Sequence, residues 1–281
     1  GLGIVLIPTV AELCGFYLHS FTVFIMGENS SEFLILCITF LNIHINRHLY
    51  KYRFKLSLDI IINIYYNIKM IKLLNGDCLD LLDDLEENSI DIIYTDPPYI
   101  PPEHSKTLTK YKKTLSEMGI LEGFFKTFLK KIDRVLKDDG IFLIYCNSDS
   151  YPMFYIHLFP YVKKMRCFVW DKINCSLGYT FRHQHEMIIC GERFNMKPIK
   201  CGLGDVFKFK VVKAKEKDHP AEKPVDLHKH ILQNIATENR VVLDPFMGTG
   251  SIGLACKELN CDYIGMELES DYFNISKNKL L

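Results

Sequence analysis

From Met70 onward, short apolar runs alternate with stretches in which apolar residues recur at helical spacing. A short run bounded by turn residues is typical of a buried strand. Apolar positions at i, i+3, i+4 and i+7, as between Leu121 and Leu136, are typical of a helix that packs one face on a sheet. The alternation predicts an α/β domain with a mainly parallel sheet. The predicted strands are Ile71–Leu74, Ile90–Tyr94, Ile141–Tyr145, Val241–Leu243 and Tyr263–Met266.

Other segments of this region add detail to the prediction. Arg166–Asp171 and His185–Cys190 flank a turn that contains glycine, so they are expected to pair as an antiparallel hairpin at the sheet edge. Asn195–Asp218, rich in lysine, is the most linker-like piece. Ser251 is expected to cap a helix over Ile252–Leu259, and a last helix is expected over Asp271–Leu280.

Residues 1–69 follow a different pattern. Nine of these 69 residues are charged, about 13%, against 59 of the 212 residues from Met70 onward, about 28%. Neither apolar stretch, Leu2–Met26 with Glu12 inside it or Phe33–Ile45, offers the ~18 uncharged residues that a membrane-spanning helix needs. Three interpretations stay open: sequence read through in frame before a start at Met70, a membrane- or partner-binding leader, and an extra domain. We therefore separate a hydrophobic leader, 1–69, from a domain at 70–281.

Charge and cysteine content exclude several classes of protein. Lysine plus arginine and aspartate plus glutamate both number 34, so a histone-like protein that binds by bulk charge is not expected. The ten cysteines include no CxxC pair, so neither a zinc site nor a redox dithiol is predicted. Reduced, buried thiols in a cytoplasmic protein are the expectation.

A glycine-rich turn follows the predicted strand at Val241–Leu243. Its sequence, Asp244-Pro-Phe-Met-Gly-Thr-Gly250, places unhindered backbone at the start of a helix, where α/β proteins commonly bind ligands. Glu267 ends the next predicted strand, a position from which acids commonly accept the hydroxyls of a ribose. The turn lacks the Gly-Lys-Ser/Thr of a triphosphate-binding loop. A purely structural turn is the alternative.

A second motif, Asp96-Pro97-Pro98-Tyr99, follows the predicted strand Ile90–Tyr94. The two prolines stiffen the backbone and remove two N–H donors, so the turn presents acceptors only. Such a site suits an exocyclic amino group, and Tyr99 offers a face on which a base could stack, worth ~1–3 kcal/mol. The alternative is a rigid turn with Tyr99 packed in the core.

Thr95–Tyr99 and Asp244–Gly250 together resemble the catalytic and cofactor motifs of the amino-group DNA methyltransferases that use S-adenosylmethionine. The order, catalytic motif first, is similar to their circularly permuted β class, and the resemblance covers nearly all of residues 70–281. Further similar segments are Asn75–Cys78, Trp170–Lys172, Phe181-Arg182, His185-Glu186, and His219-Pro-Ala-Glu-Lys-Pro224 with Leu227, which resembles the HPxxKP helix of the family.

This resemblance implies a Rossmann-like methyltransferase fold and S-adenosylmethionine as the cofactor. Asp96 and Pro97, with Pro98 and Tyr99, would hold the substrate amine and stack on a base flipped out of the duplex. Asp77 would accept the adenine amino group of the cofactor, and Glu267 its ribose hydroxyls. The remaining residues implied at the cofactor are Asp244, Phe246, Gly248, Gly250, Lys223 and Pro224.

The implied activity is methylation of DNA, at adenine N6 because DPPY accompanies adenine more often than cytosine in this family. Methylation of cytosine N4 and a non-catalytic relative that binds S-adenosylmethionine or DNA are the alternatives. DNA and a cognate restriction endonuclease are the implied partners, the cytoplasm is the expected location, and no metal or membrane partner is expected. Only about 25 residues separate Arg193 from His219, fewer than relatives use for target recognition, so the DNA-reading site stays open.

Overall fold

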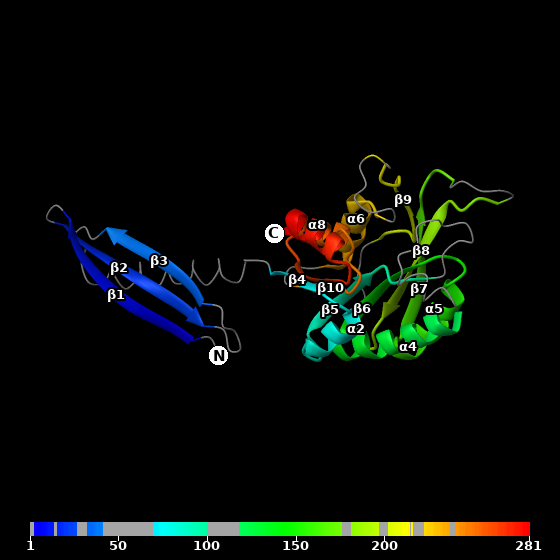
Figure 1. Cartoon of the computed structure of the whole chain (residues 1–281), viewed down its shortest axis with the longest axis horizontal. Helices are drawn as coiled ribbons and strands as arrows, with labels where there is room; N and C mark the ends of the chain where they lie inside the picture. The colour runs from blue at the N-terminus through cyan, green and yellow to red at the C-terminus, as the bar shows by residue number, and fades with distance from the viewer. Residues whose placement is uncertain are drawn as a thin grey trace. The chain divides into compact units, whose positions relative to one another are not determined.

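The computed structural model describes residues 3–13, 16–26, 33–41, 70–99, 118–175, 181–196, 202–213, 215, 222–236 and 240–281. The chain divides into two compact units, Gly1–Ile68 and Lys69–Leu281. In the first unit, β1 (Gly3–Leu13), β2 (Phe16–Met26) and β3 (Phe33–Leu41) form an antiparallel sheet in that order, for which the sequence pattern predicted no strands (Figure 1).

The second unit contains an eight-stranded sheet in the order β4-β11-β10-β5-β6-β8-β7-β9. Its strands are β4 (Ile71–Asn75), β5 (Ile90–Thr95), β6 (Leu136–Cys146), β7 (Lys164–Asp171), β8 (His185–Glu192), β9 (Val206–Lys208), β10 (Val241–Asp244) and β11 (Asp262–Glu267). The five strands β4, β11, β10, β5 and β6 are parallel to their neighbours in this order. Strand β8 pairs antiparallel with both β6 and β7. Because β9 is parallel to β7, β8 alone runs against the other seven strands. The predicted α/β class with a mainly parallel sheet is confirmed.

The predicted hairpin forms, but it is not the edge of the sheet. Strands β7 and β8 pair from Lys164 opposite Glu192 to Asp171 opposite His185. Outside β7 lies β9, within the segment expected to be a linker. A strand of three residues is too short for a period-2 pattern. Its backbone pairing with β7 is accompanied by a side-chain contact, in which the indole of Trp170 donates a hydrogen bond to the carbonyl of Phe209 (2.7 Å).

Helices cover both faces of this sheet (Figure 1). One face carries α2 (Cys78–Leu81), the 3-10 turn η1 (Leu82–Asp84), α4 (Met118–Val135), α5 (Tyr151–Leu158) and the 3-10 turn η2 (Phe159–Tyr161). The other carries α6 (Val225–Ile235), α7 (Ser251–Glu258) and α8 (Ser270–Leu280). Side chains alternate along a strand, so Ile93 packs in the first layer while Ile92 and Tyr94 pack in the second.

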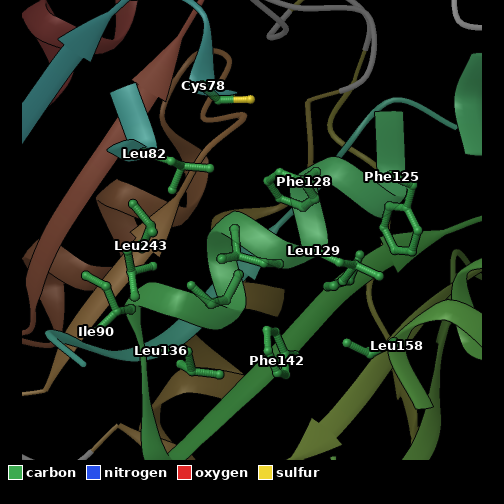
Figure 2. Close-up of a cluster of buried hydrophobic side chains, with 14 of the residues drawn as sticks. Cys78, Leu82, Ile90, Phe125, Phe128, Leu129, Leu136, Phe142, Leu158 and Leu243 are labelled. Carbon is green, nitrogen blue, oxygen red and sulfur yellow. The ribbon is translucent and has the colours of Figure 1, made fainter. Parts of the chain in front are cut away.

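The core under α4 is built from aromatic and aliphatic side chains at the predicted helical spacing. Phe125 and Phe128 are fully buried in it, and the ring of Phe125 stacks on that of Phe154 with centroids 3.8 Å apart. Figure 2 shows Phe125, Phe128 and Leu129 of α4 above Phe142 of β6, with Leu136 beside Phe142. This packing holds α4 against the strands that end at the acidic motifs.

The expected helix cap at Ser251 is wrong. Helix α7 begins at Ser251 itself, and Gly250, with φ +84°, is the residue before the first turn. In the described part of the chain, no side chain makes a capping hydrogen bond at this end of α7. The Ser251 hydroxyl lies instead 3.2 Å from Nε2 of His228 on α6, so a contact between two helices takes the place of the local cap.

Replacement of Phe125 by alanine is expected to lower the free energy of unfolding of this unit by about 3–5 kcal/mol, because a buried ring leaves a cavity against Phe154. Denaturant unfolding followed by tryptophan fluorescence measures this, since Trp170 is the single tryptophan and is buried here. The matched control, Phe159→Ala, removes a ring that is 61% exposed and is expected to change stability by less than about 0.5 kcal/mol. Equal losses would contradict the assignment of Phe125 to the core.

Candidate functional site

A pocket opens at the edge of the sheet where β4, β5, β10 and β11 have their carboxyl ends. These strands are parallel, so the residues that follow them meet at one edge, the usual binding place in open α/β sheets. The pocket is lined by Gly76–Cys78, Asp96, Pro98, Tyr145, Glu222, Lys223, His228, Asp244–Thr249, Ser251, Ile252, Glu267–Glu269 and Tyr272.

Most of the residues singled out in the sequence meet in this pocket. Eight line it: Asp77, Asp96, Pro98, Lys223, Asp244, Phe246, Gly248 and Glu267. Four others flank it without belonging to its lining: Pro97, Tyr99, Gly250 and Pro224. The structure thus joins the two motifs, which lie about 150 residues apart in the chain, in a single cavity.

The glycine-rich turn is fastened to the end of β11. The amide of Gly248 donates to Oε2 of Glu267 (2.9 Å), and the amide of Glu269 donates to Oε1 (2.9 Å). Gly248 has φ +54°, and a Cβ built there would have no atom within 4 Å, so bare backbone faces open space. Burial raises the pKa of the Glu267 carboxyl above its ordinary value, although the backbone donors oppose the rise.

Asp244 supports the turn from beneath. It is 1% exposed, and its Oδ1 accepts hydrogen bonds from the Thr95 hydroxyl (2.8 Å) and the Phe246 amide (3.2 Å). The Tyr263 hydroxyl donates to Oδ2 (3.3 Å). Burial raises the pKa of Asp244 to about 7. Its hydrogen bond to Thr95 ties the cofactor-type motif directly to the residue before Asp96.

Phe246 and Gly250 have packing roles as well. The Phe246 ring lies against Phe124 and Phe128 of α4, with centroids 6.0 and 5.3 Å away. A Cβ at Gly250 would come within 3.0 Å of the Leu280 side chain on α8, so this glycine permits close packing of the helix as well as a positive φ.

Asp77 stands at the end of β4, next to Glu267. Its Oδ1 accepts from the amide of Leu79 (2.9 Å) and so caps the short helix α2. The amide of Gly76 and the side chain of Asn75 both donate to the Glu267 carbonyl, at 3.0 and 2.7 Å. These bonds hold the carboxylates of Asp77 and Glu267 in the walls of the same pocket.

Asp96 has two carboxylate oxygens in different environments. Oδ2 accepts from the ammonium of Lys223 at 2.6 Å. Oδ1 is buried and has no hydrogen-bond partner among the residues that the structure describes. Pro97 and Pro98 beside it are buried and carry no N–H. Tyr99 is half-buried and packs against the core cluster under α4, and burial raises the pKa of its hydroxyl.

A chain of buried charges continues from Asp96 to the hairpin. The Lys223 ammonium lies 3.1 Å from Oε2 of Glu186 on β8, and Oε1 of Glu186 accepts from Lys172 at 2.6 Å. Burial opposes both charges, but the two lysines together lower the pKa of Glu186 to about 2, and Asp96 and Glu186 hold the pKa of Lys223 well above its ordinary value. The resemblance implied that Lys223 lies at the cofactor. In the structure its ammonium donates a hydrogen bond to Asp96.

Sequence reasoning missed a buried polar cluster in the wall of the pocket. Nδ1 of His228 lies 2.9 Å from the Tyr94 hydroxyl and 3.4 Å from that of Tyr145, and its Nε2 approaches Ser251. Burial, followed by the charge of Lys223, lowers the pKa of His228 to about 3 and keeps the ring neutral. The available signal was a histidine on the otherwise apolar buried face of α6, beside Leu227 and Ile231.

The pocket fits the cofactor that the resemblance implies. The glycine-rich backbone offers a cradle next to Gly248 that a side chain would fill. Glu267 and Asp77 supply carboxylate acceptors in the walls, as ribose hydroxyls and an adenine amino group require. Within the described ranges no cluster of three or more histidine, cysteine or acidic side chains could hold a metal. The helices in those ranges are too short or too polar to cross a bilayer.

Comparisons with known proteins agree with this geometry. The family model described as DNA methylase, of the N6/N4 methyltransferases, matches residues 192–278. The type II methyltransferase M.HinfI of Haemophilus influenzae is 29% identical over 74% of this chain and 67% of its own length. M.HpaI of Haemophilus parainfluenzae is 28% identical over 74% of each chain.

Solved structures share the fold. The M1.HpyAVI–SAM complex superposes with a TM-score of 0.57 and 23% identity over 75% of this chain and 99% of its own. PvuII DNA methyltransferase, described as cytosine-N4-specific, superposes with a TM-score of 0.63 and 16% identity, over 76% of this chain and 87% of its own. The resemblance drawn from the motifs is confirmed: part of the chain matches the N6/N4 DNA methylase model, most of it is similar in sequence to type II DNA methyltransferases, and it shares the Rossmann-like fold of the solved methyltransferases. Its motif order is consistent with their β class.

Asp244→Asn is expected to change how stability depends on pH. The folded-state pKa of about 7 lies above the ordinary value of 3.8, so the native state keeps a proton that the unfolded chain loses. The stabilisation by that proton is complete below about pH 4 and is lost as pH rises to about 7, by at most roughly 4 kcal/mol. The free energy of unfolding of the wild type minus that of the variant should fall over this range and then level off. A difference that is independent of pH would contradict the buried carboxyl.

Proposed function

We propose that this chain transfers a methyl group from S-adenosylmethionine to the N6 amino group of adenine in DNA. The observation that carries the proposal is the Oδ1 atom of Asp96, a buried carboxylate oxygen in the pocket wall with no donor among the described residues. An unpaired buried acceptor costs stability unless a ligand supplies the donor. An exocyclic amine does so, and the prolines beside Asp96 cannot.

The assignment of the cofactor rests on the opposite wall of the pocket. Glu267 would accept the ribose hydroxyls and Asp77 the adenine amino group, while Gly248, Gly250, Phe246 and Asp244 form the turn beside the methionine part. Bound there, S-adenosylmethionine supplies a methyl group on a sulfonium, ready for attack by a nitrogen. The solved M1.HpyAVI structure is a complex with this cofactor, which supports the proposal.

The protein's own residues act by orienting the amine. Asp96 Oδ1 and the Pro97 carbonyl would accept the two N–H bonds, drawing the nitrogen lone pair out of conjugation with the ring and toward the methyl group. Tyr99 would stack on the flipped base. Accepting the methyl group would place on the nitrogen the positive charge that leaves the sulfur, and the nitrogen would then release a proton readily, so Asp96 need not be a strong base. Catalysis then comes from proximity and electrostatic complementarity.

Adenine is favoured by the aspartate of DPPY. In the family that this chain resembles, DPPY accompanies adenine more often than cytosine. Cytosine N4 is the second candidate, since PvuII DNA methyltransferase gives a TM-score of 0.63 and is described as cytosine-N4-specific. The type II designation of the relatives supports a partnership with a restriction endonuclease as part of the proposal.

Nucleoside analysis distinguishes the two bases. DNA incubated with the full chain and labelled S-adenosylmethionine is digested to nucleosides and separated by chromatography, and label is expected in N6-methyladenine. Label in N4-methylcytosine would replace adenine by cytosine in the proposal. Absence of label, with cofactor binding intact, would favour a non-catalytic relative.

Asp96→Ala is expected to lower methyl transfer by about 10³-fold or more, because the loss of one pre-oriented acceptor removes a large electrostatic contribution. Cofactor affinity, measured by calorimetry, should change little, since Glu267 and Asp77 are untouched. Asp133→Ala, on α4 and away from the pocket lining, is the control and should retain activity. Equal loss of cofactor binding and activity in Asp96→Ala would show that Asp96 has been given the wrong role.

A further inference from the structure

Lys223 is surrounded by groups of the transfer site. It is 5% exposed, and its ammonium lies 2.6 Å from Oδ2 of Asp96 and 3.1 Å from Oε2 of Glu186. The ring of Tyr145 takes a third side, with its centroid 5.1 Å from the nitrogen. The ammonium donates one hydrogen bond to Asp96, and it lies at ion-pair distance from Glu186 Oε2, an atom without a hydrogen-bond partner in the described part of the chain. The charge of Lys223 is therefore compensated on the side of the pocket that carries Asp96.

The position of this ammonium is fixed from both ends. Pro224, the next residue, is the N-cap of α6, and its carbonyl accepts from the amide of Leu227 (3.1 Å). At the far end, Glu186 is itself anchored by Lys172, whose ammonium stands 5.2 Å from the ring of Trp170. Lys223 therefore connects the start of α6 to the β7–β8 hairpin across the end of β5.

This contact determines which way the Asp96 carboxylate faces. A carboxylate is planar, so holding Oδ2 against a buried cation also fixes the direction of Oδ1. Among the described residues, Oδ1 of Asp96 and Oε2 of Glu186 are the two buried side-chain oxygens without a hydrogen-bond partner, and of these two residues Asp96 is the one that lines the pocket. Without the ammonium, rotation of the carboxylate would be opposed by fewer contacts, and near-attack geometry tolerates little displacement.

We propose that Lys223, braced by Glu186, is a positioning residue for methyl transfer, which holds the Asp96 carboxylate with Oδ1 toward the substrate amine. The inference rests on the proposed function and deepens it, because it moves Lys223 from the cofactor to the amine-binding side of the pocket. Glu186 becomes a functional residue in the same step, although the sequence marked it only as part of a hairpin.

The ammonium also separates two buried acids. With Lys223 removed, Asp96 and Glu186 would share a buried space without the cation between them, and one carboxyl would bind a proton at higher pH. A protonated Asp96 is a poorer acceptor for an amine. Other ionisable groups that interact with Asp96 contribute to the same balance from the strands and turns around it: Asp244 on β10, Tyr99 in its own turn, and Tyr145 and Cys146 at the end of β6.

Lys223→Met tests the inference in the full chain. The expected result is a kcat about 10²-fold lower, the scale that misplacement of a reacting group produces, while the Kd for S-adenosylmethionine by calorimetry stays within about threefold, a small change on the affinity scale. The acid limb of the kcat–pH profile should move to higher pH. Adding Glu186→Gln should bring that limb back toward the wild-type position, because the charge of Glu186 then no longer acts on Asp96.

Two further variants serve as controls. Lys137→Met removes an ion pair with Asp91 (2.9 Å) at the amino ends of β5 and β6, the other edge of the sheet, and should keep the wild-type kcat and pH profile. Lys223→Arg keeps a cation at the site and should retain the wild-type acid limb with an intermediate kcat. If the methionine variant does not fold, Lys223→Arg and Glu186→Gln carry the same comparison, and wild-type values in both would overturn the inference.

The outcomes separate this inference from the proposed function. A weaker cofactor Kd with an unshifted pH profile would return Lys223 to the cofactor and overturn it, as would an unchanged kcat. A readout without catalysis is the pH dependence of unfolding: a carboxyl with a raised pKa gives stability below about pH 4 that is lost as pH rises. Lys223→Met should therefore lose stability relative to the wild type between pH 4 and 8. If Lys223→Met loses stability in this way but the wild type does not methylate DNA, the proposed function is contradicted and the contact between Lys223 and the two acids is not.

Discussion

Strand β10 lies between β5 and β11 and is parallel to both, and the site depends on this pairing. Each of the three strands ends in or just before an acid: Asp96 after β5, Asp244 on β10 and Glu267 on β11. Because the strands are parallel, these acids lie at the same edge of the sheet. The two motifs are distant in the chain, and the sheet brings them together into one site.

The acids at this edge have different roles because their surroundings differ. Asp244 is buried among hydroxyl donors and an amide, Glu267 is engaged by two backbone amides, and Asp96 faces an ammonium on one side only. Asp244 thereby supports the fold, whereas Asp96, with one oxygen that has no donor in the described part of the chain, and Glu267, whose oxygens each keep a further lone pair, can accept hydrogen bonds from a ligand. The difference between these residues lies in hydrogen-bond partners and not in residue type.

The strands at the site could be predicted because their runs are short, apolar and closed by turn residues. Ile90–Tyr94 and Tyr263–Met266 each lie within an observed strand. Helix α5 was not predicted, since Tyr151–Leu158 is apolar on nearly all sides and has no helical period to detect. Likewise, the partner of Lys223 could not be predicted from spacing, because Asp96 lies 127 residues away and only the completed sheet brings them together. The roles given to individual site residues stay predictions.

The pairing of β4 with β11 gives the pocket a thermodynamic property of its own. Strand β4 bonds to a single neighbour within the eight-stranded sheet, and the contacts that hold Asp77 beside Glu267 span 192 residues of sequence. Closing so long a loop is entropically costly. A small molecule that binds both carboxylates favours the closed state, and it stabilises the domain by RT ln(1 + [L]/Kd). Occupancy of the pocket and integrity of the sheet edge are then a single linked equilibrium, in which metabolite concentration sets how often the edge strand opens.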